Sequence, residues 1–377
     1  MRCSDLRVRL LAVVSATTLA TIGVAACGSD ATTSTNAPTD AAGDSHADGT
    51  TSGNTNDAND MADAISSFEA GSTDANDERP PSIRRPFLVG SSLRTAGSQA
   101  RDDWSAARLS SGDDVAFDLA LDPAVARELA KSWLADGLEE HASIAAFARF
   151  TMMMLSVAAP PELIAASQRA SLDEIAHARD CFALARRYGA TDAGPGPLDV
   201  HDAMGPGPGS LADLAALTAE EGCVGETLGA ALAGEQLAVA VDPEVRRILA
   251  RIARDEARHA ELAWRFVAWA ISEERRGAPG AEGVTRAVTA AATHAIAATR
   301  ATEIRPFSAD VAQWHQHGRL TCAEAREASE RTIVDVLLPC LEALRGHRTA
   351  EPIPETARPD VISFSGCGTC EEAVSSG

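Results

Sequence analysis

The feature that most constrains this chain is a short motif that occurs twice in its middle section. Both copies have the pattern Asp-Glu-x-x-His, and they occupy residues 173–177 and 255–259. Residues three positions apart lie on one face of an α-helix, so the Glu and His of each copy present an oxygen and a nitrogen to the same point. The duplication therefore predicts two helices that face each other and offer these groups from opposite sides.

Hydrophobic periodicity predicts an all-α fold around the two motifs. Apolar residues recur three and four positions apart, and breaks rich in Pro and Gly mark the helix boundaries. Runs of β-branched residues with a period of two are absent, which argues against a large sheet. The expected bundle helices cover residues 123–157, 161–188, 211–240 and 243–272, and two further helices cover residues 281–303 and 321–345.

The connectors indicate how the four bundle helices are arranged. The first and third connectors are very short, so each joins antiparallel neighbours. A helix of about 27 residues is about 40 Å long. The middle connector has about twenty residues and can span up to about 66 Å when extended. It can therefore run the full length of the bundle, which would make the third helix parallel to the second.

Carboxylates on the first and third helices complete a candidate site for two metal ions. Glu140 lies on the apolar stripe of the first helix and is expected to point inward. On the third helix, alignment of the two halves favours Glu221. Glu226 lies about 140° away around a regular α-helix and remains an additional or alternative ligand if the helix is distorted. The candidate ligands are Glu140, Glu174, His177, Glu221, Glu226, Glu256 and His259.

These motifs resemble those of the ferritin-like superfamily, including bacterioferritins, rubrerythrins and di-iron hydroxylases. The resemblance covers residues 122–272 and implies a four-helix bundle with a long crossover between helices two and three. It implies two iron ions bridged by Glu174 and Glu256, although manganese or mixed Mn/Fe centres share these ligands. It also implies that Asp173 and Asp255 hold the ligating imidazoles from behind.

The resemblance also implies a chemistry. A carboxylate-rich di-iron centre reacts with dioxygen or peroxide, so we expect an oxidoreductase that acts on a small molecule or on Fe²⁺ itself. The sequence leaves two alternatives to an oxidoreductase. The chain could bind metal without turnover, or it could be a structural bundle without metal.

The N-terminal residues predict export and a lipid anchor. A basic start precedes an apolar stretch over residues 10–24, which is typical of a signal peptide. The stretch ends in Val24-Ala25-Ala26-Cys27, which resembles the lipobox of bacterial lipoproteins. The resemblance implies cleavage before Cys27, lipidation of its thiol and attachment to the cell envelope. By resemblance to lipoprotein sorting signals, Gly28 favours the outer membrane over the inner one.

Composition divides the rest of the chain into segments. The formal net charge is −21, which argues against a nucleic-acid partner because such proteins need a basic face. The region after Cys27 is acidic and rich in small polar residues, and it is expected to be disordered. The oligomeric state stays open, with a homodimer included. The expected order is a signal peptide (1–26), an acidic disordered tether (27–115), the bundle (116–275), accessory C-terminal helices (276–348) and a flexible tail (349–377).

Overall fold

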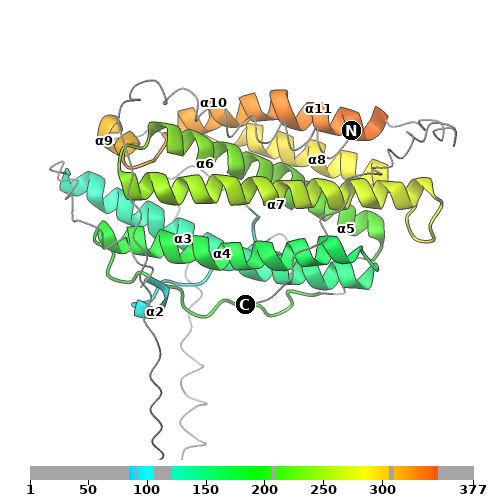
Figure 1. The fold of residues 1–377 in the computed structure, drawn as a ribbon, viewed down its shortest axis with the longest axis horizontal. Coiled ribbons are helices and arrows are strands. Elements are labelled where there is room, and N and C mark those ends of the chain that lie inside the picture. The colour runs from blue at the N-terminus through cyan, green and yellow to red at the C-terminus, as the bar shows by residue number, and fades with distance from the viewer. Residues whose placement is uncertain (1–84, 91, 106–120, 206–208, 305–309, 347–377) are drawn as a thin grey trace, which may run out of the picture.

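The computed structural model describes residues 85–90, 92–105, 121–205, 209–304 and 310–346. This part of the chain is mostly helical, in agreement with the all-α prediction (Figure 1). No helix within these ranges combines the length and apolar character needed to cross a bilayer. The predicted signal peptide, the lipidation site Cys27 and the predicted tail lie outside the described residues.

Two helical hairpins carry the two copies of the motif. The helices α3 and α4 form the first hairpin. The second hairpin pairs α7 with a composite third helix, in which a π-helical segment, η1, separates α5 from α6. The bounds are α3 (Pro123–Ser156), α4 (Pro161–Arg187), α5 (Leu211–Thr218), η1 (Ala219–Glu226), α6 (Thr227–Val239) and α7 (Pro243–Arg275). The two hairpins pack together through α4 and α7.

The sequence Asp-Pro starts both α3 and α7. The side chain of Asp122 accepts a hydrogen bond from the Ala124 N–H, and that of Asp242 accepts one from the Glu244 N–H. The following proline occupies a position whose own N–H would have no helical partner. A cap of this kind stabilises a helix by about 1 kcal/mol. Local sequence therefore determines where these two helices begin.

Two apolar clusters at opposite ends of the bundle show the directions of the helices. One cluster gathers the beginnings of α3 and α7 and the residues just after α4 and α6. Its members include Val125, Tyr188, Ala240 and Val245. The other gathers the opposite ends, and its members include Met154, Leu163, Leu214 and Phe266. The third helix therefore runs parallel to α4, and the connector after α4 crosses the length of the bundle, as predicted.

The C-terminal helices pack against the third helix. Figure 1 shows α8, α10 and α11 stacked on the side of the molecule away from α3 and α4. The helix α8 contacts α5 and η1, while α10 contacts α6. Their bounds are α8 (Val284–Ala301), α9 (Val311–Gln316), α10 (Cys322–Thr332), the π-helical η2 (Ile333–Leu337) and α11 (Leu338–Gly346). These helices cover the outer side of the distorted third helix.

The segment over residues 85–105 differs from its prediction. Composition placed it in the disordered tether of residues 27–115, yet it forms a short hairpin of β1 (Leu88–Val89) and β2 (Ser92–Leu93) and a short helix, α2 (Asp102–Ser105). Phe87 is buried, and the Ser143 hydroxyl on α3 donates a hydrogen bond to the Arg85 carbonyl at 2.8 Å. We call residues 85–90 and 92–94 the N-terminal strap. The composition of the whole segment is polar on average, so the short apolar run within it did not stand out.

Candidate metal centre

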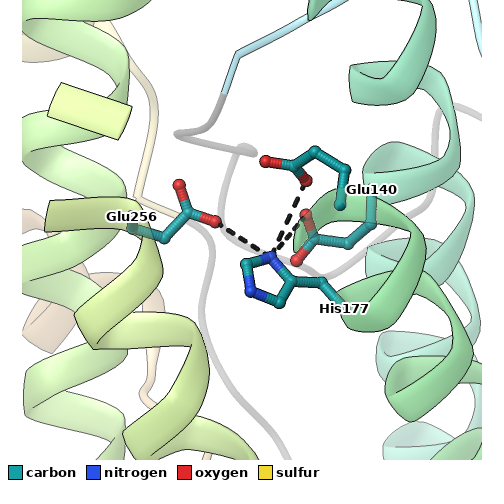
Figure 2. A group of neighbouring side chains, drawn as sticks. Glu140, His177 and Glu256 are labelled. Atoms are coloured by element: carbon teal, nitrogen blue, oxygen red, sulfur yellow. Dashed lines mark ion pairs between the residues drawn. The ribbon is translucent and has the colours of Figure 1, made fainter. Parts of the chain in front are cut away.

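Two groups of buried carboxylate and imidazole side chains meet in the middle of the bundle. Each residue of a group offers one ligand atom, and these atoms lie within 4.8 Å of one another. The first group contains Glu140, Glu174, His177 and Glu256, and the second contains Glu226, Glu256 and His259. Glu256 belongs to both, so the groups adjoin. Figure 2 shows the carboxylates of Glu140 and Glu256 approaching the His177 ring from α3 and α7.

The carboxylates of Glu174 and Glu256 each face both imidazoles. Glu174 places Oε2 3.8 Å from Nδ1 of His177 and Oε1 3.0 Å from Nδ1 of His259. Glu256 places Oε1 3.5 Å from Nδ1 of His177 and Oε2 3.5 Å from Nδ1 of His259. Glu140 places Oε2 3.8 Å from Nδ1 of His177. This is the arrangement that two bridging carboxylates and one terminal carboxylate would need.

The second nitrogen of each imidazole meets an aspartate from the other copy of the motif. Nε2 of His177 lies 3.3 Å from Oδ2 of Asp255, and Nε2 of His259 lies 3.3 Å from Oδ2 of Asp173. When Nε2–H donates to the aspartate, the lone pair of a neutral ring is on Nδ1, which faces the cluster. Each aspartate thus reaches across to the imidazole of the opposite helix.

The third helix contributes Glu226 to the cluster, contrary to the preference for Glu221. Glu226 is the last residue of η1 and is 1% exposed, whereas Glu221 accepts a hydrogen bond from Nη2 of Arg149 at 3.1 Å and belongs to neither group. The preference assumed a regular α-helix. The i→i+5 hydrogen bonds of a π-helix widen the turn, so the residues of η1 face directions that differ from those in a regular α-helix. Glu226 therefore reaches the cluster while Glu221 turns to Arg149.

The two glutamates of η1 give a matched pair of variants. We expect Glu226→Gln to weaken binding of the second metal ion by at least about 100-fold. Even the loss of a residue that only hydrogen-bonds to a ligand lowers metal affinity by about 10- to 100-fold. Glu221→Gln should keep both ions, because its amide oxygen can still accept from Arg149. Elemental analysis after dialysis of each full-length variant makes the comparison. The opposite result, with both ions kept only by Glu226→Gln, would restore Glu221 as the ligand.

Burial and charge determine which groups of the metal-free cluster hold protons. Burial, together with the charge of Glu256, raises the pKa of Glu226 well above its ordinary value. Burial acts to lower the pKa of His177 and of His259, but interaction with the surrounding carboxylates outweighs it and raises both pKa values well above normal. Burial acts to raise the pKa of Glu256, yet the two imidazoles, each 3.5 Å away, hold it well below normal. A divalent cation would therefore replace protons when it binds.

Several buried polar atoms of the cluster lack hydrogen-bond partners, as expected for atoms that would bind a metal ion. Among the described residues, Nδ1 of both imidazoles, Oε2 of Glu174 and both carboxylate oxygens of Glu226 and of Glu256 have none. An unsatisfied buried polar group costs about 1–3 kcal/mol, and a charged one costs more. Metal ions would satisfy all of these atoms together. A donor set of carboxylate and imidazole suits iron, manganese or zinc rather than Cu(I).

Two buried arginines near the cluster were not singled out from the sequence. Arg149 on α3 binds Glu221, and Arg85 of the N-terminal strap places Nε 3.7 Å from Oε1 of Glu226. Arg149 stands between Phe147 and Phe150 in an otherwise apolar stretch of its helix. A charge inside an apolar run was the signal available for Arg149. Arg85 had no comparable signal because its segment was assigned to the tether.

No family model, curated protein or solved structure matches this chain. The chemistry of the cluster itself is therefore the basis of the functional proposal.

Proposed function

We propose that this chain is a ferritin-like di-metal protein, with iron as the metal, that uses dioxygen or peroxide to oxidise a small substrate or Fe²⁺. The observation that carries the proposal is the pair of adjoining Glu/His groups that share Glu256. Two Glu-x-x-His helices and two helices that each add a glutamate form the ligand pattern of di-iron and di-manganese carboxylate bundles. The long crossover after α4 is also the connectivity of ferritin-like folds.

The residues of the chain would divide the work at such a centre. The four glutamates and two histidines would hold two iron ions, which together supply the electrons that reduction of dioxygen or peroxide needs. Asp173 and Asp255 would keep the imidazoles oriented. Glu140 and His177 are fully buried, so the packed helices would keep bulk water away from the reacting groups.

A surface cavity supports access of a small molecule to one edge of the cluster. The cavity lies between α4 and α7, measures about 420 Å³, and includes Asp173 and His259 in its lining. Its lining also includes three arginines, at positions 169, 258 and 265. The carboxylates of Asp173 and Glu261 also line the cavity, so three positive charges face two negative ones. This small positive excess favours a small organic or anionic substrate over Fe²⁺.

The lipid anchor belongs to the same proposal. Residues 1–84 lie outside the described ranges, so attachment at Cys27 rests on the lipobox-like sequence alone. Several acyl chains on one residue would anchor the protein stably, whereas a single chain would not. We propose that the site works at the cell envelope, with the outer membrane favoured over the inner one.

Oxygen uptake tests the proposed turnover. We expect anaerobically Fe²⁺-loaded full chain to consume oxygen when air is admitted, because the paired irons can deliver electrons that a single stored Fe²⁺ cannot. An oxygen electrode follows the reaction, and elemental analysis gives the metal content. The control is the same Fe²⁺ concentration with the Glu226→Gln variant. Two ions bound without oxygen uptake would instead support a metal-binding protein without turnover.

A further inference from the structure

Arg85 is a buried cation beside the candidate metal centre. Its side chain is 2% exposed, and its Nε lies 3.7 Å from Oε1 of Glu226, which is too long for a hydrogen bond. Its Nε and Nη1 have no hydrogen-bond partner among the described residues. A guanidinium is never deprotonated in proteins, so this positive charge persists inside the bundle.

The structure around Arg85 holds its guanidinium in this position. The Cζ atom lies 4.7 Å from the ring centroid of Phe147 and 4.5 Å from that of Phe150, which is close enough for cation–π attraction. Gly222 of η1 makes room for it, because a Cβ there would lie 2.8 Å from Nη2 of Arg85 and 2.6 Å from Cβ of Ala263. The position therefore depends on a glycine in the distorted helix.

Metal binding would leave the charge of Arg85 without an equal partner. Two divalent ions balance the four carboxylates of the cluster, and the two imidazoles are neutral when they ligate metal. Glu221, the other acidic group near Arg85, is already bound by Arg149. An uncompensated charge at this depth is costly unless a counter-charge accompanies it. One further negative charge would restore the balance.

We propose that Arg85 and the metal-loaded cluster together form a binding site for one small monovalent anion, on the Glu226 side of the cluster. The unpartnered Nε and Nη1 atoms point to different edges of the guanidinium, and either can donate a charge-assisted hydrogen bond to such an anion. The arginines around the cavity at His259 add a positive field outside the cluster. This inference rests on the proposed function and narrows its substrate class to small anions.

Anion titration of the full chain loaded with Co²⁺ tests the site. Elemental analysis first establishes two ions per chain, and visible absorption then follows titration with formate at constant ionic strength. We expect one formate per chain, no effect from formamide (the neutral analogue) and binding about 10- to 100-fold weaker in Arg85→Gln, since a hydrogen bond to a charged group is worth about 1.5–3 kcal/mol. Arg85→Lys, which keeps the charge but loses the planar guanidinium, should fall between these two proteins.

Arg94→Gln is the matched control. It removes one positive charge from the same strap, where Arg94 pairs with Asp199 on the surface, and formate affinity should stay within about twofold of the unchanged protein. Two cobalt ions without saturable formate binding would overturn the anion site alone. Equal formate affinity in Arg85→Gln would also overturn it. Failure to bind two ions would overturn both the proposed function and this inference.

Discussion

Replacing Glu256 with alanine is expected to abolish metal binding at both groups, taking the chain from two ions to none after dialysis. Glu256 is the residue that the two groups share, and its two oxygens face the two imidazoles separately. Its removal takes a ligand from each ion at once. Metal affinity should therefore fall by more than the roughly 10- to 100-fold that is lost when a hydrogen-bond partner of a ligand is removed. Elemental analysis of the full chain after anaerobic Fe²⁺ loading measures the outcome.

Glu273→Ala is the matched control for this variant. Glu273 lies on the same helix and pairs with Arg276 at the surface, so its loss should cost no more than about 1 kcal/mol of stability and no metal. Circular dichroism on both variants checks that the helices are retained. A folded Glu256→Ala protein that still binds two ions would show that the metal is held elsewhere, and the proposed centre would be wrong.

The parts of the fold that follow from local sequence were predictable. Asp-Pro pairs at positions 122–123 and 242–243 cap and start their helices through hydrogen bonds within a few residues, so the starts of α3 and α7 agree with the prediction. The spacing of Glu and His in each motif likewise needs only regular helix geometry. That is why Glu174, His177, Glu256 and His259 fall together as expected.

The predictions that were wrong concern residues whose positions depend on tertiary contacts rather than on local helix geometry. The π-helical segment η1 brings Glu226 to the cluster, and Gly222 within it packs against Arg85 and Ala263, which are far apart along the chain. Nothing in local periodicity predicts where a turn widens. Arg85 was missed for a related reason. Its segment is polar on average and becomes ordered through burial of Phe87 and contacts with the bundle, which composition cannot represent.

Removal of the metal is expected to destabilise the protein, and by more at alkaline than at neutral pH. A ligand present at about 1,000 times its dissociation constant adds about 4 kcal/mol to stability, and chelation removes that amount. The metal-free cluster relies on protons on His177, His259 and Glu226, whose pKa values are raised in the folded state. The stabilisation from protonated histidine is complete below its ordinary pKa of 6.5 and disappears as the pH rises through the folded-state values.

Protonated Glu226 stabilises the metal-free protein with the same pH dependence. Its pKa is also raised in the folded state, so its stabilisation is lost as the pH rises. The lowered pKa of Glu256 has the opposite sign, but its contribution is lost only as the pH falls below the ordinary value of 4.5 and does not vary in the alkaline range. The stability of the metal-free form therefore falls as the pH rises, whereas metal binding becomes stronger. For each proton that the metal displaces, the binding free energy improves by about 1.4 kcal/mol per pH unit. The difference in melting temperature between loaded and chelated protein should therefore widen from about pH 6 to about pH 9.

Calorimetric melting of the full chain, with and without a chelator, measures that difference at each pH. Glu256→Ala supplies the control, since a protein that holds no metal should melt at the same temperature with or without chelator. A difference that narrows as the pH rises would mean that metal does not compete with protons for His177, His259 and Glu226. Equal melting temperatures at every pH would favour a bundle whose stability owes nothing to metal, in which the buried carboxylates are balanced by their protons and by Arg85 alone.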